Sequence, residues 1–182
     1  MSAFFLTFVA VAAAMLAGRD AIRVARLRAS LGWVAPLLFT VLLAALAGAG
    51  LAAWIAQELS PLIRPRVKPL VVGLALALAA GEVLLRSASK SPREPTWSMG
   101  AITLVLLLGM VTDASGFIIL SLAIATGEPL LAASGGALGA ILVLGSAVAA
   151  GDDWQALPLG QIRITVGVAL LVAAMAIVVS GR

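Results

Sequence analysis

The 182-residue chain contains no cysteine, no histidine and no tyrosine. The lack of cysteine excludes disulfides and thiolate metal sites, and the lack of histidine excludes imidazole ligands and histidine-based catalysis. A bound metal would need carboxylate, hydroxyl and carbonyl oxygens, the ligands that suit Mg²⁺, Ca²⁺ and Mn²⁺. No phosphate loop, nucleophile elbow or paired-carboxylate hydrolase pattern is present, so we predict neither an enzyme nor an organic cofactor.

Charged side chains are also scarce, at 11% of the chain, whereas 63% of the residues are hydrophobic. A soluble domain of this length cannot hide so much apolar surface, so lipid must solvate much of it. The richness in Ala, Leu, Val and Gly suits closely packed membrane helices, and no lipid-facing strand alternation is found. The net charge of +4 is better explained by basic loops than by nucleic-acid binding. We therefore predict an all-α integral membrane protein.

Six apolar stretches are candidates for transmembrane helices. They cover residues 3–17, 31–56, 69–85, 98–124, 129–150 and 161–180. The first is short unless its helix continues through Arg19 to Arg28, and the fourth is interrupted around Asp113. Because no Lys or Arg precedes the first stretch, we interpret it as an uncleaved helix and not as a signal peptide.

The basic residues predict an orientation. Eight of the twelve follow the first, third and fifth stretches, and four lie on the opposite side. Basic loops face the cytoplasm, so we expect both termini outside it and the loop 86–97 inside it. The expected location is a bacterial inner membrane.

The two halves of the chain resemble each other. A linker at residues 89–97 separates residues 1–88 from 98–182, and a shift of about 94 residues aligns the halves. The shift places Gly73 on Gly167 and brings Pro36 near Pro129, where an Ala/Gly-rich helix opens in each half. Three helices per half is an odd number, so we predict two inverted repeats. Many secondary transporters follow this plan, although channels and structural proteins also carry such repeats.

Asp113 is the leading candidate for a functional residue, since apolar sequence lies on both sides of it. A carboxylate inside a membrane costs a few kcal/mol and usually marks an ion or proton path. Thr112 and Ser115 are expected to supply neighbouring oxygens. The alternative is an acid that only locks two helices together.

The other acids have simpler explanations. Asp20 is a weaker site candidate, because Arg19, Arg23 and Arg26 recur at helical spacing and form a basic face that can pair with it. Glu82 is expected to pair with Arg86, four residues on. Glu128 and the acids at 152–153 are expected at solvated helix ends.

Glycines and tryptophans have structural interpretations. The pattern of small residues predicts close helix crossings, and the four tryptophans lie near predicted helix ends, as an interfacial belt requires. The packing glycines are Gly135, Gly136 and Gly139 in the fifth stretch and Gly48 and Gly50 in the second, and the tryptophans are Trp33, Trp54, Trp97 and Trp154.

The arrangement resembles the family of Golgi and bacterial manganese/calcium transporters related to human transmembrane protein 165. The likeness spans nearly the whole chain and is clearest at residues 115–125 and 128–139. That family carries Glu-x-Gly-Asp-Lys-(Ser/Thr) in each half, where facing acids are thought to exchange a divalent cation for protons. Here residues 110–115 read Met-Val-Thr-Asp-Ala-Ser, and residues 16–21 read Leu-Ala-Gly-Arg-Asp-Ala. Arg19 thus stands where the family has an acid.

The resemblance implies a secondary transporter of the Mn²⁺/Ca²⁺–proton exchanger type, with altered or lost ion specificity. Asp113 would be its ion or metal ligand, with Ser115, Thr112 and Asp20 as partners. Arg19 either blocks the path or forms a salt bridge with Asp113 across the pseudo-two-fold axis. The alternative function is a non-transporting structural or regulatory membrane paralogue. Expected partners are the lipid bilayer, divalent cations and protons, and homo-oligomerisation is left open.

Overall fold

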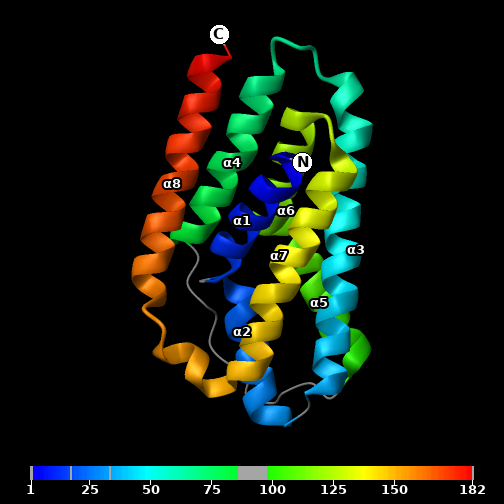
Figure 1. The fold of residues 1–182 in the computed structure, drawn as a ribbon, viewed down its shortest axis with the longest axis vertical. Coiled ribbons are helices and arrows are strands. Elements are labelled where there is room, and N and C mark those ends of the chain that lie inside the picture. The colour runs from blue at the N-terminus through cyan, green and yellow to red at the C-terminus, as the bar shows by residue number, and fades with distance from the viewer. Residues whose placement is uncertain (1, 17, 33, 86–97, 182) are drawn as a thin grey trace.

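A computed structural model describes residues 2–16, 18–32, 34–85 and 98–181, and every regular element in these ranges is helical. The elements run in a bundle with their long axes roughly aligned (Figure 1). In chain order they are α1 (Ser2–Leu16), α2 (Arg19–Leu31), α3 (Ala35–Leu59), η1 (Ser60–Leu62), α4 (Lys68–Leu85), α5 (Met99–Thr112), α6 (Ala114–Thr126), α7 (Pro129–Ala150), η2 (Gly151–Ala156) and α8 (Leu159–Ser180).

The described helices supply four to six membrane spans. Four are long and apolar enough to cross a bilayer by themselves: α3 with η1, α4, α7 with η2, and α8. The pairs α1–α2 and α5–α6 pass the same test only together, and they bend by 59° and 49°. The six apolar stretches of the sequence therefore correspond to four continuous helices and two bent pairs.

An extended residue precedes the second helix of each bent pair. Gly18 has φ −69° and ψ 157° before α2, and Asp113 has φ −96° and ψ −179° between α5 and α6. The sequence places Asp113 near the middle of one helix, where polar residues interrupt the apolar stretch 98–124, and the structure divides that helix into α5 and α6 at Asp113. A break frees backbone groups that lipid cannot satisfy, so the two breaks must lie against protein or a polar cavity.

Taken in chain order, the helices of the second half run opposite to those of the first half. In Figure 1, α3 ascends and α7 descends, whereas α4 descends and α8 ascends. The pair α1–α2 descends and the pair α5–α6 ascends. The chain therefore visits the two ends of the bundle in the opposite order in its second half.

The packing of α4 against α8 contains the same kind of glycine contact twice. A Cβ added at Gly73 would lie 2.4 Å from Val178, and one added at Gly167 would lie 2.4 Å from Leu84. Residues 73 and 167 differ by 94 positions, and so do residues 84 and 178. The two glycines therefore make the same close contact from opposite sides of one interface.

The other glycines show where helices approach most closely. Added Cβ atoms at Gly135 and Gly139 of α7 would lie 2.2 and 2.7 Å from the backbone oxygens of Phe4 and Phe8 in α1. At Gly136 the added atom would meet Ile119 at 2.5 Å. Backbone thus packs on backbone where α1 crosses α7.

In α3, an added Cβ at Gly48 would lie 2.9 Å from Met110 of α5. Gly50, however, has open space around it, so the expectation that it packs against a helix was wrong.

The apolar exterior suits contact with lipid. Large apolar side chains stay exposed along α3 and α8, and in α8 only Gly167, Leu170 and Ala174 are buried. Trp54 is exposed, as expected for an interfacial belt, but Trp154 is buried beside α2, so the belt interpretation was wrong there. Trp33 and Trp97 lie outside the described residues.

Candidate functional site

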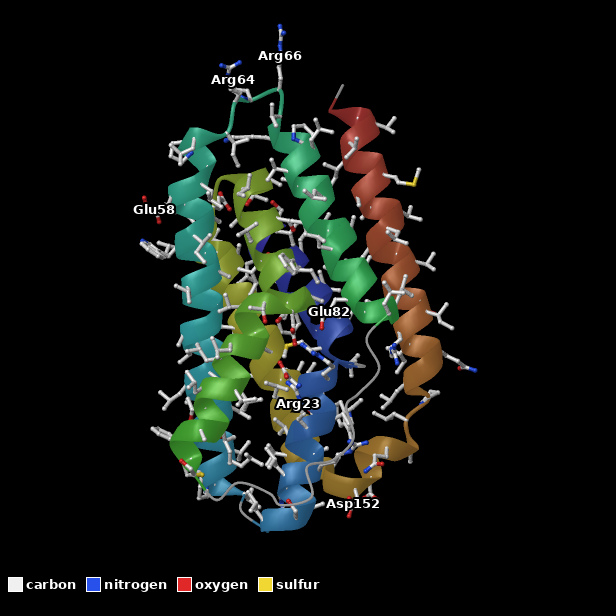
Figure 2. All side chains as sticks on the ribbon, turned by 180° about the vertical axis from the view of Figure 1, so that it is seen from behind. Arg23, Glu58, Arg64, Arg66, Glu82 and Asp152 are labelled. Carbon is white, nitrogen blue, oxygen red and sulfur yellow. The ribbon has the colours of Figure 1, made fainter. Side chains whose placement is uncertain are left out.

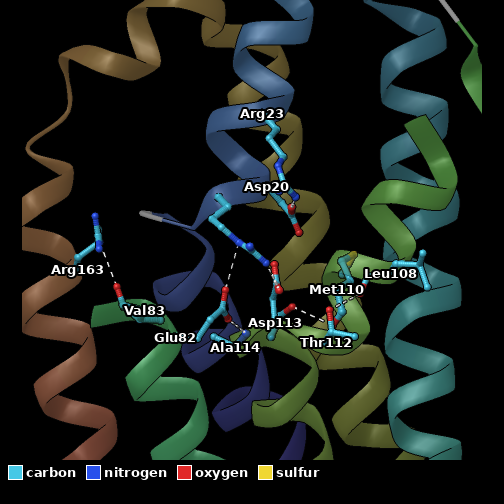
Figure 3. Close-up of polar contacts among 12 residues, drawn as sticks. Asp20, Arg23, Glu82, Val83, Leu108, Met110, Thr112, Asp113, Ala114 and Arg163 are labelled. Atoms are coloured by element: carbon cyan, nitrogen blue, oxygen red, sulfur yellow. Dashed lines mark hydrogen bonds and ion pairs between the residues drawn. The ribbon is translucent and has the colours of Figure 1, made fainter. Parts of the chain in front are cut away.

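The two helix breaks and the C-terminal part of α4 meet inside the bundle. Figure 3 shows the first turn of α2, the start of α6 and the last turns of α4 surrounding a group of charged side chains. In Figure 2, Glu82 lies near the middle of the bundle and Arg23 lies between it and the end that carries Asp152, whereas Arg64 and Arg66 lie at the opposite end. Glu82 therefore lies inside the bundle and not at either of its ends.

Arg19 joins these three elements. It is the first residue of α2, and its Nη2 donates a hydrogen bond to Oδ1 of Asp113 at the start of α6. Its Nε lies 3.4 Å from Oε1 of Glu82 on α4. One guanidinium thus bridges two carboxylates from different helices, a geometry that suits the planar fork of arginine. The sequence left two roles open for Arg19, a block of the path or a salt bridge with Asp113. The structure contains the salt bridge.

Glu82 is a member of the site that the sequence interpretation missed. Besides Arg19, its Oε2 accepts a hydrogen bond from the backbone N–H of Ala114. It therefore caps the start of α6, where the side chain of Asp113 makes no capping bond. The expected partner Arg86 lies outside the described residues. The position of Glu82 within the apolar stretch 69–85 was the signal that could have identified it.

Asp20 lies beside this cluster and forms an ion pair with Arg23 on the same helix. Its side chain is buried, and Oδ1 accepts a hydrogen bond of 3.0 Å from Nη1 of Arg23. Gly109 of α5 leaves room for it, because an added Cβ there would lie 2.7 Å from Oδ2. Asp20 thus pairs within the basic face and also lines the small cavity beside Asp113, so it combines features of both interpretations.

The two hydroxyl candidates lie in different places. Ser115 is buried, lines the same small cavity as Asp113 and donates to the backbone oxygen of Met110 at 3.2 Å. Thr112 is exposed and donates to the backbone oxygen of Leu108 at 2.7 Å. Only Ser115 therefore remains beside Asp113 as a neighbouring oxygen.

A small cavity lies among the charged side chains of this site. Its volume is about 30 Å³, and Arg19, Asp20, Glu82, Asp113 and Ser115 line it with apolar neighbours. A polar space of this size can hold a single water molecule. In the part of the chain that the structure describes, no three acidic side chains are grouped so as to hold a metal ion. The role of Asp113 as a metal ligand stays a prediction.

Five charged side chains of the described residues meet at this site. When ionised, Asp20, Glu82 and Asp113 contribute −3, and Arg19 and Arg23 contribute +2. Among these side chains, Arg19 is the one cation that contacts both Asp113 and Glu82.

Arg163 of α8 bonds to the backbone of α4. Its Nε and Nη2 donate to the backbone oxygens of Val83 and Leu84, both at 3.1 Å. Arg163, interpreted from the sequence as part of a basic loop, thus lies within α8 and contacts the helix that carries Glu82.

A larger hollow lies at one end of the bundle, where α3 ends, α4 begins and α6 turns into α7. Its volume is about 690 Å³. Lys68, Glu128 and Gln57 are the longest polar side chains lining it, and Lys68 donates to Ser60 at 3.1 Å. Glu128 is exposed at the start of α7, as the sequence led us to expect. The hollow opens to solvent and has few polar groups.

No family model, curated protein or solved structure matches the chain. The resemblance to the manganese/calcium transporters therefore stays a prediction, and the functional argument rests on the geometry of the site.

Proposed function

We propose that this chain is a secondary transporter built from two inverted three-helix repeats. It moves a cation through a site at Asp113 and Glu82. One observation carries the proposal: the guanidinium of Arg19 lies between two carboxylates where two broken helices meet. Broken helices around buried charges near mid-membrane are typical of the binding sites of such transporters.

Several observations support an inverted repeat. The bent pair, the long helix and the last helix recur in the same order in both halves, and corresponding helices run in opposite directions (Figure 1). Arg19 and Asp113 are 94 residues apart, the same shift that relates Gly73 to Gly167. Two equivalent residues that touch each other must lie next to the pseudo-two-fold axis. The site therefore belongs at the interface between the repeats.

The charge of the site favours a divalent cation, with Mn²⁺ and Ca²⁺ as the first candidates. When ionised, Asp113 and Glu82 contribute two negative charges, and Arg23 lies beside Asp20. A divalent ion beside a guanidinium would be strongly repelled, by roughly twice the 4 kcal/mol of two unit charges 4 Å apart at an effective dielectric of about 20. Cation binding therefore requires that Arg19 leave the carboxylates.

The second candidate function is a non-transporting structural or regulatory membrane protein. Two features favour it: Arg19 occupies the place of a cation, and the cavity of about 30 Å³ leaves little room beside it. Under this alternative, the ion pairs serve only to hold α2, α4 and α6 together.

Flux in proteoliposomes separates the two candidates. We expect the wild-type chain to take up Mn²⁺ or Ca²⁺, Asp113→Asn to reduce the rate at least about tenfold, and Glu58→Gln to leave it unchanged. Glu58 is an exposed acid at the end of α3, far from the site, and is a matched control (Figure 2). Absence of uptake by the wild type would favour the non-transporting role. Equal uptake by Asp113→Asn would remove Asp113 from the path.

We further propose a bacterial inner-membrane location in which the end of the bundle that carries η2 and the C-terminal end of α2 faces the cytoplasm. Arg26 and Arg28 lie in the last turns of α2, and Arg64 and Arg66 lie at the opposite end (Figure 2). The bias of basic residues toward the first end supports this orientation. Both termini would then be outside the cytoplasm.

A further inference from the structure

We infer that the larger hollow, at the end of the bundle that carries Arg64 and Arg66, binds a zwitterionic lipid of the phosphatidylethanolamine type. Lys68 holds the phosphate of the headgroup, and Glu128 holds its primary ammonium. The acyl chains lie on exposed apolar side chains of α7. This lipid site is separate from the charged cluster at Asp113 and does not depend on transport there.

The hollow lies where two membrane-spanning helices end. Its volume of about 690 Å³ falls within the roughly 300–1,000 Å³ of small-molecule sites. Ser60 lies in η1, at the end of the span that α3 begins, and Lys68 is the first residue of α4. Both spans are long and apolar enough to cross a bilayer, so their ends reach the headgroup region. The hollow is therefore at the level of the lipid headgroups.

Two opposite charges line the hollow from different elements. Lys68 belongs to the first turn of α4, and Glu128 directly precedes α7. The Nζ of Lys68 donates to Oγ of Ser60 at 3.1 Å, and a lysine ammonium has further N–H groups to donate. Neither Lys68 nor Glu128 forms an ion pair with another described side chain. The hollow thus offers one cation and one carboxylate to a ligand that carries both charges.

The headgroup of phosphatidylethanolamine matches this pair of charges. Its phosphate accepts hydrogen bonds from the ammonium of Lys68, and its own ammonium donates to the carboxylate of Glu128. Phosphatidylglycerol has no positive group for Glu128. Phosphatidylcholine has a positive group without an N–H, so it cannot donate a hydrogen bond to the carboxylate.

The apolar part of the lining favours a lipid over a soluble ion. Leu130 and Leu131 in the first turn of α7 line the hollow, and Leu130 is 80% exposed. Leu138 and Leu142 are also exposed, and their spacing from Leu131 continues one face of α7. Because α7 runs from the hollow toward the other end of the bundle, this face provides an apolar track for an acyl chain (Figure 1).

The test compares lipids that differ only in their headgroups. Native mass spectrometry of the full chain in detergent measures the binding of phosphatidylethanolamine, phosphatidylglycerol and phosphatidylcholine with identical acyl chains. We expect the wild type to bind phosphatidylethanolamine at least about fivefold more tightly than the other two, because only this headgroup bonds to both charges. Inorganic phosphate and glycerophosphoethanolamine, the headgroup without acyl chains, should bind at least about tenfold more weakly than the lipid.

Two substitutions assign the binding to this hollow. Lys68→Gln should weaken phosphatidylethanolamine and phosphatidylglycerol alike by at least about tenfold, because the phosphate loses its charged partner. Glu128→Gln should weaken only phosphatidylethanolamine and so remove its preference over phosphatidylglycerol, a change of selectivity that a merely structural role would not produce. Arg64→Gln and Glu58→Gln remove exposed charges at the same end that do not line the hollow, and they should bind as the wild type does.

Three results would overturn the lipid site. They are equal binding of the three lipids by the wild type, a preference that survives both Lys68→Gln and Glu128→Gln, and inorganic phosphate bound as tightly as the lipid. If one variant is poorly folded, the preference of the wild type and the selectivity of the other variant decide. Uptake of Mn²⁺ by the wild type is a separate measurement, so failure of the lipid site is distinguishable from failure of the proposed transport.

Discussion

Single residues in this chain are understood only through what they touch across helices. Asp113 was identifiable from its apolar surroundings, but its partner Arg19 lies 94 residues away. Glu82 had a local explanation in Arg86, which lies outside the described residues, and the structure shows that it also contacts Arg19 and the start of α6. The spacing of charges along the sequence therefore did not reveal the contacts of Arg19 with Asp113 and Glu82.

The contacts of Glu82 predict a stability effect. Glu82→Ala leaves Arg19 with one carboxylate and removes the acceptor of the Ala114 N–H. Removing one partner of a buried ion pair costs about 3 kcal/mol, so we expect a clearly lower thermal unfolding temperature in detergent. Glu58→Ala, at an exposed site, is the control and should unfold like the wild type. Equal unfolding temperatures for the two variants would contradict the bridging role of Glu82.

At the scale of elements, the helix breaks position the charged side chains of the site, and small residues let the surrounding helices pack closely. The breaks at Gly18 and Asp113 allow Arg19 and Asp113 to meet, and Arg163 bonds to the backbone of α4 one residue after Glu82. Between α1 and α7 the backbones approach so closely that Gly135 leaves no space for a methyl group. The glycine pattern therefore fixes where α1, and with it the first break, is placed.

This crossing predicts unequal effects of two glycine substitutions in α7. At Gly135 an added Cβ would lie 2.2 Å from a backbone oxygen of α1, whereas at Gly145 the nearest atom is a side-chain carbon of Leu38 at 3.9 Å. Gly135→Ala should destabilise the protein by about 2–3 kcal/mol, because the helices must separate. Gly145→Ala should be neutral or stabilising by up to about 1 kcal/mol, since alanine favours helix. Thermal unfolding of both variants measures the difference, and equal shifts would argue against the crossing.

At the scale of the whole molecule, the charges divide between two ends and a centre. Arg64 and Arg66 lie at one end of the bundle and Asp152 at the other, while Arg19 and its partners lie between them (Figure 2). The exposed apolar side chains of α3 and α8 cover the sides between these ends. This distribution is that of a multi-pass membrane protein with a polar site near its centre.

The arrangement predicts labelling from opposite sides of the membrane. The chain has no cysteine, so single substitutions at Arg66 and Asp152 provide unique labelling sites. In whole cells, a thiol reagent that does not cross the membrane should label the cysteine at position 66, and the one at position 152 only after the membrane is opened. Labelling of both positions from one side would contradict the fold, and the reversed result would contradict the orientation alone.

The sequence by itself determined the helical membrane character. Hydrophobic residues make up 63% of the chain and form stretches about as long as a bilayer-spanning helix, which leaves few alternatives. It also drew attention to Asp113, since an acid between apolar residues is costly unless it has a use. Only the tertiary structure decided that Arg19 bridges Asp113 and Glu82, that Thr112 is exposed, and that Asp113 interrupts a helix. Hydropathy is a sum over neighbours in sequence and fixes which segments enter lipid. The pairing of charges depends on distances between helices, which arise only when the helices pack together.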